Sequence, residues 1–225
     1  MTLTVYREVE QRSEEWAELR RGIVTASNVG QLLTATRRVA ANDYSRGLTA
    51  LLVAERITGY TEPTFINADM WRGIEDEPRA IEKYAEHYKV PVEPCGFMVR
   101  DFGGQVLGFS PDGLVGDDGL VEVKSRRQKK HLLTILNDAV PDENMAQIQA
   151  GLLVSGRKWC DYISYCGGMP MWVKRIKPDA DWFAAITAAV IAFEERAAEM
   201  VAAYETATKG LAATERVDTV LGLEF

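Results

Sequence analysis

The segment Ser110–Lys124, SPDGLVGDDGLVEVK, decides how this chain is interpreted. Its last residues alternate valines with Glu122 and Lys124, which is the pattern of a strand with one buried face. Residues two apart on a strand project from the same face, so Glu122 and Lys124 should project together. A glycine-bounded turn at 116–119 folds the chain back and can bring Asp112 beside Glu122. We therefore expect two carboxylates and one ammonium group to converge at the end of a strand.

The elements around this segment follow an order that indicates a mixed fold. Strands are expected where short apolar runs are bounded by turns, at residues 97–100, 105–109, 120–125, 159–166 and 171–176. Helices are expected at residues 13–20, 44–57, 70–88, 143–154 and 179–206, and a short helix should start at Thr25–Ser27 with Ser27 as its cap. Pro78 predicts a kink or a fresh helix start. The order predicts an α/β or α+β fold with a central mixed sheet flanked by helices.

Length and composition are those of an ordinary globular domain. The chain has 225 residues, of which 47% are hydrophobic, and this is enough to bury a core without disulfides. We expect one domain over residues 1–225, ending in a hairpin and a helix. The three cysteines have no C-x-x-C spacing, which disfavours a disulfide framework or a zinc site. No apolar run is long enough to span a bilayer, so we expect a cytoplasmic protein without a membrane partner.

The net charge of −7 argues mildly against a nucleic-acid partner, because phosphate contacts come from lysine and arginine. A local basic stripe can nevertheless coexist with an acidic exterior. Arg126, Arg127, Lys129 and Lys130 directly follow the expected strand at 120–125. Such a run is usually a solvated face, but beside the expected cluster of two carboxylates and an ammonium group we favour contact with a nucleic-acid backbone.

The three converging side chains suit phosphodiester hydrolysis. Carboxylate oxygens are the ligands that Mg²⁺ prefers, and a bound metal ion can activate water and stabilise charge on a phosphate. The ammonium group of Lys124 can donate to the attacking water or the phosphate. A Glu-x-Lys pair is also common on exposed strands, and Pro-Asp-Gly is an ordinary turn. The spacing alone therefore leaves a nuclease and a surface ion pair both open.

Four blocks of sequence extend this pattern. They are WAELRRGIVTAS at residues 16–27, GIEDEPRA at 73–80, SPDGL through EVK at 110–124, and MAQIQ at 145–149. In order and spacing, these blocks resemble the phage lambda exonuclease family, also called YqaJ-type viral recombinases, within the PD-(D/E)xK nuclease superfamily. The resemblance covers about residues 16 to 154 and implies a restriction-endonuclease-like fold.

The resemblance assigns catalytic and metal-binding roles to this chain. It implies that Asp112 and Glu122 bind two Mg²⁺ ions, with Mn²⁺ possible, and that Val123 contributes its backbone carbonyl. Lys124 would position or activate the water. Glu77 would complete the acidic cluster, although a helix carboxylate can equally be a solvated surface group, and Pro78 next to it could tilt it away.

The same resemblance implies a grip on the terminal 5′ phosphate by Arg20, Ser27, Ser110 and Gln147. An arginine fork pairs well with a phosphate dianion, and hydroxyl and amide groups complete the hydrogen bonds. The alternative for the two serines is capping or turn formation. For Arg20 the alternative is an exposed surface cation.

The function that the resemblance implies is a 5′-to-3′ exonuclease of a phage or prophage in a bacterial host. It would degrade one strand of linear double-stranded DNA and leave a 3′ overhang for a single-strand-annealing recombinase. The family also suggests a homotrimer around DNA. An endonuclease or a DNA-repair nuclease is the alternative, and a non-catalytic DNA-binding subunit is a third reading. Three cysteines do not make the four-cysteine pattern of the iron–sulfur nucleases.

Overall fold

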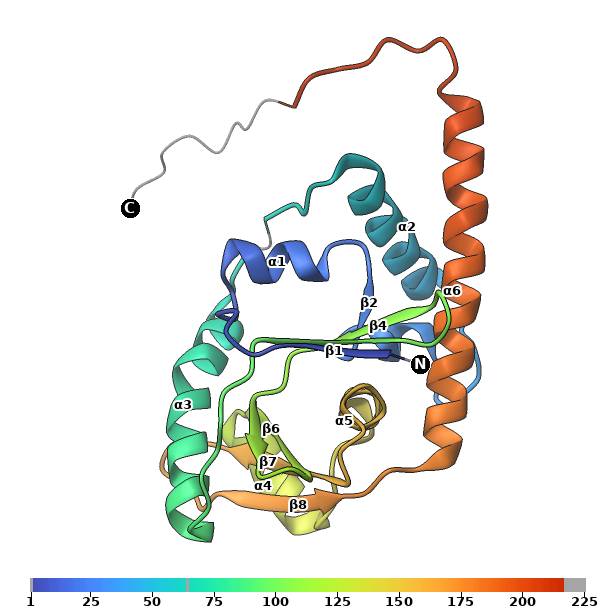
Figure 1. Ribbon diagram of the computed structural model, residues 1–225. Helices are drawn as coiled ribbons and strands as arrows, with labels where there is room; N and C mark the ends of the chain where they lie inside the picture. Colours follow the sequence, from blue (N-terminus) through green and yellow to red (C-terminus); the bar gives the residue numbers. More distant parts are fainter. Residues whose placement is uncertain (1, 64, 217–225) are drawn as a thin grey trace.

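Two sheets form the framework of the computed structural model, which describes residues 2–63 and 65–216 (Figure 1). The first sheet has the order β1-β3-β4-β2. Its strands are β1 (Thr2–Tyr6), β2 (Val24–Thr25), β3 (Phe97–Asp101) and β4 (Val106–Phe109). The β3–β4 pair is the expected antiparallel hairpin, β1 adds to β3 antiparallel, and β2 adds to β4 parallel. The short strands β1 and β2 were not expected from the sequence.

The second sheet carries the segment with Glu122 and has the order β5-β6-β7-β8. Its strands are β5 (Gly113–Val115), β6 (Gly119–Ser125), β7 (Trp159–Tyr165) and β8 (Trp172–Ile176). The central pair β6–β7 is parallel, and both outer pairs are antiparallel. The mixed α+β fold class is thus confirmed, with the strands divided between two sheets.

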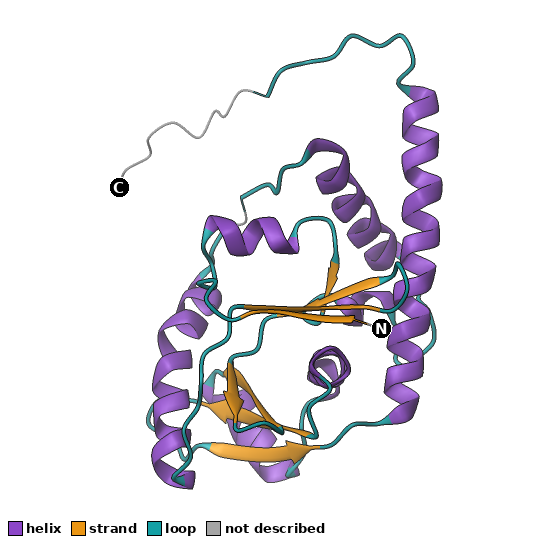
Figure 2. Ribbon diagram, viewed as in Figure 1, coloured by secondary structure: helices purple, strands orange, loops and turns teal. Residues whose placement is uncertain are grey.

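Helices cover and separate the two sheets (Figures 1 and 2). They are α1 (Glu14–Arg20), the 3₁₀ helix η1 (Val29–Leu32), α2 (Asp43–Thr58), α3 (Ala68–Tyr88), α4 (Gln128–Asn137), α5 (Asp142–Ser155) and α6 (Ala180–Ala207). Helix α5 lies between the sheets and contacts β3, β4 and β7. Helix α3 packs against β6 and β7, and α4 and α5 form the connection between these parallel strands. None of the described helices is long and apolar enough to cross a bilayer.

Two apolar cores lie on opposite faces of the second sheet. The larger core includes Leu120 and Tyr162 together with side chains of α5 and α6. The smaller one joins Val121 and Val123 of β6 to residues of α3. This alternation is the one predicted for residues 120–125, and it puts Glu122, which is only 1% exposed, on the face opposite to the valines.

Several local expectations were wrong for identifiable reasons. The turn at Thr25–Ser27 leads into η1 rather than an α-helix, and the residue at the cap position is Asn28 instead of Ser27. The side chain of Asn28 accepts the backbone N–H of Thr25 and does not cap the helix. Helix α3 runs through Pro78, which excludes the fresh helix start that was one of the two alternatives for this proline. Helix α4 was missed because its apolar positions do not form a buried stripe: Leu133 and Leu136 are exposed.

Candidate active site

Asp112, Glu122 and Lys124 meet beside β6. Asp112 lies where the chain passes from β4 of the first sheet to β5 of the second. Its Oδ2 accepts the backbone N–H of Val123 at 2.6 Å, which fixes the carboxylate to the middle of the Glu122–Lys124 pair. Lys124 Nζ donates to Glu122 Oε1 at 2.6 Å. The two carboxylates and the ammonium group therefore form one cluster.

The charges of this cluster favour the binding of a cation. Burial raises the pKa of Asp112 well above its usual range, the charges of Glu122 and Glu77 raise it further, and Lys124 opposes them. Burial alone would lower the pKa of Lys124, but Glu122 and Asp112 outweigh burial and raise it. Lys124 is thus held as an ammonium ion, while Asp112 lacks enough positive charge nearby to ionise easily.

Glu77, on α3, belongs to the same neighbourhood. Its charge acts on Asp112, and Glu77, Pro78 and Asp112 together line a cavity of about 640 Å³. The continuous course of α3 through Pro78 therefore leaves Glu77 beside Asp112. Glu77 Oε2 accepts a hydrogen bond from Arg12 Nη2 at 2.8 Å.

The donor set fits a divalent cation by its chemistry. Among the described residues, no three His, Cys, Asp or Glu side chains are arranged closely enough to hold a metal ion directly. Glu122 and Glu77 instead pair with Lys124 and Arg12. Asp112, Glu122 and Glu77 nevertheless lie in one neighbourhood, where burial first and then the repulsive charge of Glu122 raise the pKa of Asp112. Hard oxygen donors of this kind suit Mg²⁺ or Mn²⁺, and a cation would relieve the repulsion.

Asp112→Asn should stabilise the protein in the absence of divalent cations while removing activity. The asparagine oxygen can still accept the N–H of Val123, but the variant no longer buries a charge at this position, and the repulsion from Glu122 disappears. We expect a gain of about 1 kcal/mol in the free energy of unfolding near neutral pH, as is common when a strained active-site charge is removed.

A carboxyl whose folded-state pKa is raised stabilises the fold below its unfolded pKa, and this contribution is lost as pH rises through the folded pKa. The gain should therefore shrink towards acidic pH in denaturant titrations. Lower stability of the variant at neutral pH would contradict this account.

Arg20 and Ser110, two of the four residues predicted to bind phosphate, are in contact. Arg20 Nη1 donates to Ser110 Oγ at 3.1 Å, and the indole N–H of Trp16 donates to the same oxygen at 2.9 Å. The guanidinium lies 4.0 Å from the centroid of the Trp16 ring. Burial lowers the pKa of Arg20 to about 10, with Glu55 opposing, so the group remains cationic at neutral pH. Because Ser110 is two residues before Asp112, this cationic group adjoins the carboxylate cluster.

The other two predicted phosphate ligands are less closely tied to this group. Ser27 is exposed, and its Oγ lies 3.0 Å from Thr25 Oγ1. Gln147 is partly buried on α5. Within the described residues, no hydrogen bond joins either side chain to Arg20 or Ser110. The neighbouring Gln149 has a different role, because its buried amide bonds to the backbone of Lys177 and Asp179 ahead of α6.

The four predicted backbone-binding cations share one cleft. Arg126, Arg127, Lys129 and Lys130 line it together with Arg72, and its volume is about 680 Å³. The cleft adjoins Ser125, the residue after Lys124. The four side chains differ in exposure, since Lys129 is exposed whereas Arg126 is largely buried.

Three of these cations are already engaged, and one of them, Lys130, pairs with Glu143. Arg126 donates to the hydroxyl of Tyr162 at 2.9 Å and to the side chain of Asn144. Its Nε is buried without a partner in the structure. Arg127 makes a two-point contact with Asp69, at 2.9 and 3.1 Å. A phosphate could replace Asp69 as the partner of Arg127, whereas Arg126 is held in place by Tyr162 and Asn144.

Sequence reasoning missed two residues that brace the site. Gln11 Nε2 donates to the carbonyls of Cys95 and Pro111, at 2.9 and 2.8 Å, and so fastens the segment before α1 to the turn that carries Asp112. Trp16 was part of a recognised block, but its bond to Ser110 was not foreseen. Both contacts join residues more than 80 positions apart, and no local pattern signals them.

Comparisons with known proteins show which family the chain resembles. The family model of the YqaJ-like viral recombinase domain matches residues 15–158. An alkaline exonuclease from Laribacter hongkongensis is 33% identical, with a TM-score of 0.79, and the match covers 89% of this chain and 100% of that one. The same enzyme in complex with dAMP gives a TM-score of 0.78 with the same identity and coverage.

More distant relatives show the fold alone. A phage-related exonuclease from Haemophilus somnus is 11% identical, with a TM-score of 0.65 over 83% of this chain and 98% of that one. A search of curated sequences finds no significant match. The family match covers more than half of the chain and includes the carboxylate cluster. The chain is therefore an exodeoxyribonuclease and belongs to the family of the YqaJ-like viral recombinase domain.

Proposed function

We propose that this exonuclease degrades one strand of linear double-stranded DNA in the 5′-to-3′ direction, starting at 5′-phosphorylated ends. The contact between Arg20 and Ser110 carries this proposal, because it puts a cationic, hydrogen-bonding group two residues from Asp112. A terminal phosphate dianion is the ligand that such a group favours. Gripping it there would leave the next phosphodiester close to the carboxylate cluster. Ser27 and Gln147 would complete the grip once the phosphate is bound.

In this proposal, the residues around β6 have separate roles in metal binding and in hydrolysis. Asp112, Glu122, the carbonyl of Val123 and Glu77 would hold two Mg²⁺ ions, or Mn²⁺ in their place. When bound, these ions would lower the pKa of water and stabilise charge on the phosphate. Lys124, kept as an ammonium ion by its neighbours, would orient the attacking water and donate to the phosphate. The packing around Glu122, which is only 1% exposed, keeps bulk water from this side of the site.

The cleft that begins after Lys124 supports a path for the DNA backbone. Lys129, Lys130 and Arg127 offer positive charge to phosphates, and Arg126 is pre-oriented by Tyr162. The related Laribacter enzyme has been seen with dAMP, a nucleoside monophosphate of the kind that stepwise digestion releases. By resemblance, the active form would be a homotrimer around DNA, and the 3′ overhang would pass to a single-strand-annealing recombinase.

A comparison of substrates tests the proposal. With Mg²⁺, a linear duplex with 5′ phosphates should lose its 5′-terminated strands, and removal of those phosphates should slow digestion at least about tenfold, the effect of losing one charge-assisted contact. A closed circle of the same sequence should remain intact. The products are resolved by strand-specific labelling on denaturing gels, with EDTA as the control for metal dependence.

Other outcomes of the same comparison point elsewhere. Cleavage of the circle would favour the endonuclease alternative. Loss of the 3′-labelled end before the 5′-labelled end would reverse the proposed polarity. Equal rates with and without 5′ phosphate would remove Arg20 and Ser110 from the proposed phosphate grip.

A further inference from the structure

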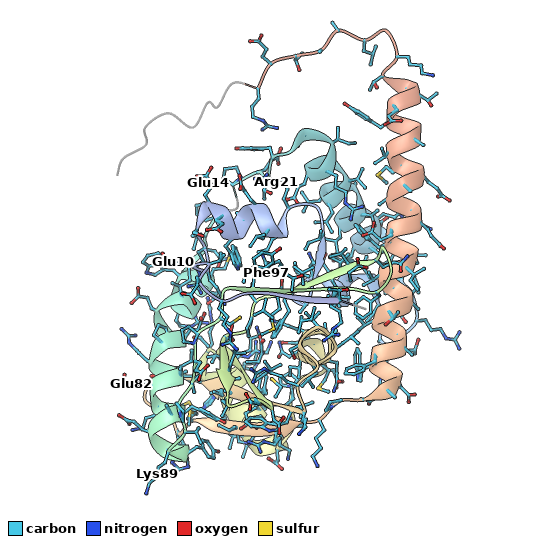
Figure 3. The ribbon with its side chains drawn as sticks, in the orientation of Figure 1. Glu10, Glu14, Arg21, Glu82, Lys89 and Phe97 are labelled. Carbon is cyan, nitrogen blue, oxygen red and sulfur yellow. The ribbon has the colours of Figure 1, made fainter. Side chains whose placement is uncertain are left out.

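Arg12 makes a contact with the active site that the reaction as described does not use. It lies in the segment between β1 and α1 and forms an ion pair with Glu77, the carboxylate on α3, at 2.8 Å. Arg12 and Glu77 side chains are 48% and 25% exposed, so both can exchange partners with the solvent. In Figure 3, Glu10, two residues earlier, lies beside α3 near the edge of the first sheet. The pair thus links the entry to α1 directly to the carboxylate cluster.

The backbone at Arg12 is held in a conformation that few side chains adopt. Its φ is +74°, in the left-handed region, which costs a non-glycine residue of the order of 1 kcal/mol. Two neighbours enforce this conformation. Gln11 is bonded to the carbonyl of Pro111, and Ser13 caps α1 while its Oγ donates to the carbonyl of Glu10. A strained residue fixed from both sides is a feature that often accompanies a functional position.

The charges of the cluster indicate how Arg12 can act on cation binding at Glu77. The three carboxylates of Asp112, Glu122 and Glu77 are matched by two cations of the chain, Lys124 on Glu122 and Arg12 on Glu77. Arg12 contacts Oε2 of Glu77, and its positive charge reduces the attraction of this carboxylate for a divalent cation. The contact of Arg12 is therefore an alternative to that cation at the same carboxylate.

We propose that Arg12 is a positioning residue that acts as an internal counter-ion for Glu77 and competes there with the divalent cation. This inference rests on the proposed metal-binding role of Glu77. In the metal-free enzyme, Arg12 holds the carboxylate towards the cluster and screens its charge from Asp112. When a cation binds, Arg12 is released from Glu77 while its backbone remains anchored by Gln11 and Ser13.

Calorimetric titration of the full chain with Mn²⁺ alone tests this competition. Arg12→Ala should tighten Mn²⁺ binding roughly two- to fivefold, the range expected when a competing exposed ion pair is removed. Arg12→Lys, which keeps a positive charge, should return the affinity towards that of the unchanged protein. Arg7→Ala is the matched control, because Arg7 lines the same cavity but pairs with Glu93 at 3.5 Å, and it should leave the affinity unchanged.

A second pair of variants separates competition from a merely structural role. In a Glu77→Gln background the Arg12→Ala change should no longer tighten Mn²⁺ binding, since its target carboxylate is gone. Arg12→Gly suits the left-handed backbone and replaces the alanine variant if that variant does not fold. Equal or weaker Mn²⁺ binding by the Arg12 variants would overturn the inference alone. Absence of Mn²⁺ binding by the unchanged protein would overturn it together with the proposed metal chemistry.

Discussion

Lys124→Ala is expected to slow DNA hydrolysis by roughly 10²–10⁴-fold, the range for loss of a group that transfers protons or stabilises transition-state charge. The ammonium group of Lys124 lies 2.6 Å from Glu122, and Glu122 and Asp112 keep it charged. No other cation pairs with these two carboxylates within the described residues. Affinity for DNA should change little, because Lys124 is one charge among several and the basic cleft lies beyond it. Single-turnover hydrolysis and DNA binding without Mg²⁺ are the two measurements.

The matched control for this variant is Lys158→Ala. Lys158 pairs with Asp118 at an exposed position far along the chain from the basic cleft, and its loss should leave both measurements unchanged. Because Lys124→Ala leaves Glu122 buried without its partner, thermal unfolding is followed in parallel, and assays are run well below the midpoint. Parallel loss of DNA affinity and hydrolysis would mean that Lys124 binds substrate and does not act on the reaction.

Arg175→Ala is expected to lower the free energy of unfolding by about 2 kcal/mol, less than for a fully buried charge pair, because the side chain of Arg175 is itself 50% exposed. Arg175 contacts Asp161 at two points, both 2.8 Å, and the side chain of Asp161 is only 4% exposed. Tyr84 of α3 donates to the same carboxylate at 2.6 Å, and burial together with this bond raises the pKa of Tyr84. Without Arg175, the charge of Asp161 would be left to a single hydroxyl group. Denaturant titration at neutral pH gives the change.

The neighbouring residue supplies the control. Lys174 lies on the same strand and pairs with Asp138, but both groups are largely exposed, so Lys174→Ala should cost less than about 1 kcal/mol. In an Asp161→Ala background, the added cost of Arg175→Ala should fall sharply. Similar losses for Lys174→Ala and Arg175→Ala would show that the burial of Asp161 does not govern the effect.

Local patterns predicted much of the framework. The alternation at residues 120–125 placed Glu122 and Lys124 on one face, and the structure has them there, opposite the valines that pack on α3. The hairpin at 97–109 was predicted because its turn is rich in glycine. Periodicity and turn residues act over a few positions, so these elements can be inferred without knowing the rest of the fold.

Contacts between distant segments could not be inferred in this way. The bond of Gln11 to Pro111 and the pairing of Arg12 with Glu77 depend on how β1 is added to the first sheet. That strand is short and its side chains are mostly exposed, so it carries no alternating apolar signal. The division of the strands between two sheets is likewise a result of tertiary packing around α5, which period and propensity do not encode.

The crossing of the chain from one sheet to the other at residues 110–112 has a mechanical consequence. Asp112 is connected to the first sheet through Phe109 and to the second sheet through Gly113. Glu122 and Lys124, in contrast, lie on a strand of the second sheet. Because Asp112 Oδ2 also accepts the N–H of Val123 in the second sheet, movement of one sheet against the other would strain the linking segment that carries Asp112. The proposed catalytic arrangement therefore depends on how the two sheets are held relative to each other, and α5, which lies between them, sets their spacing.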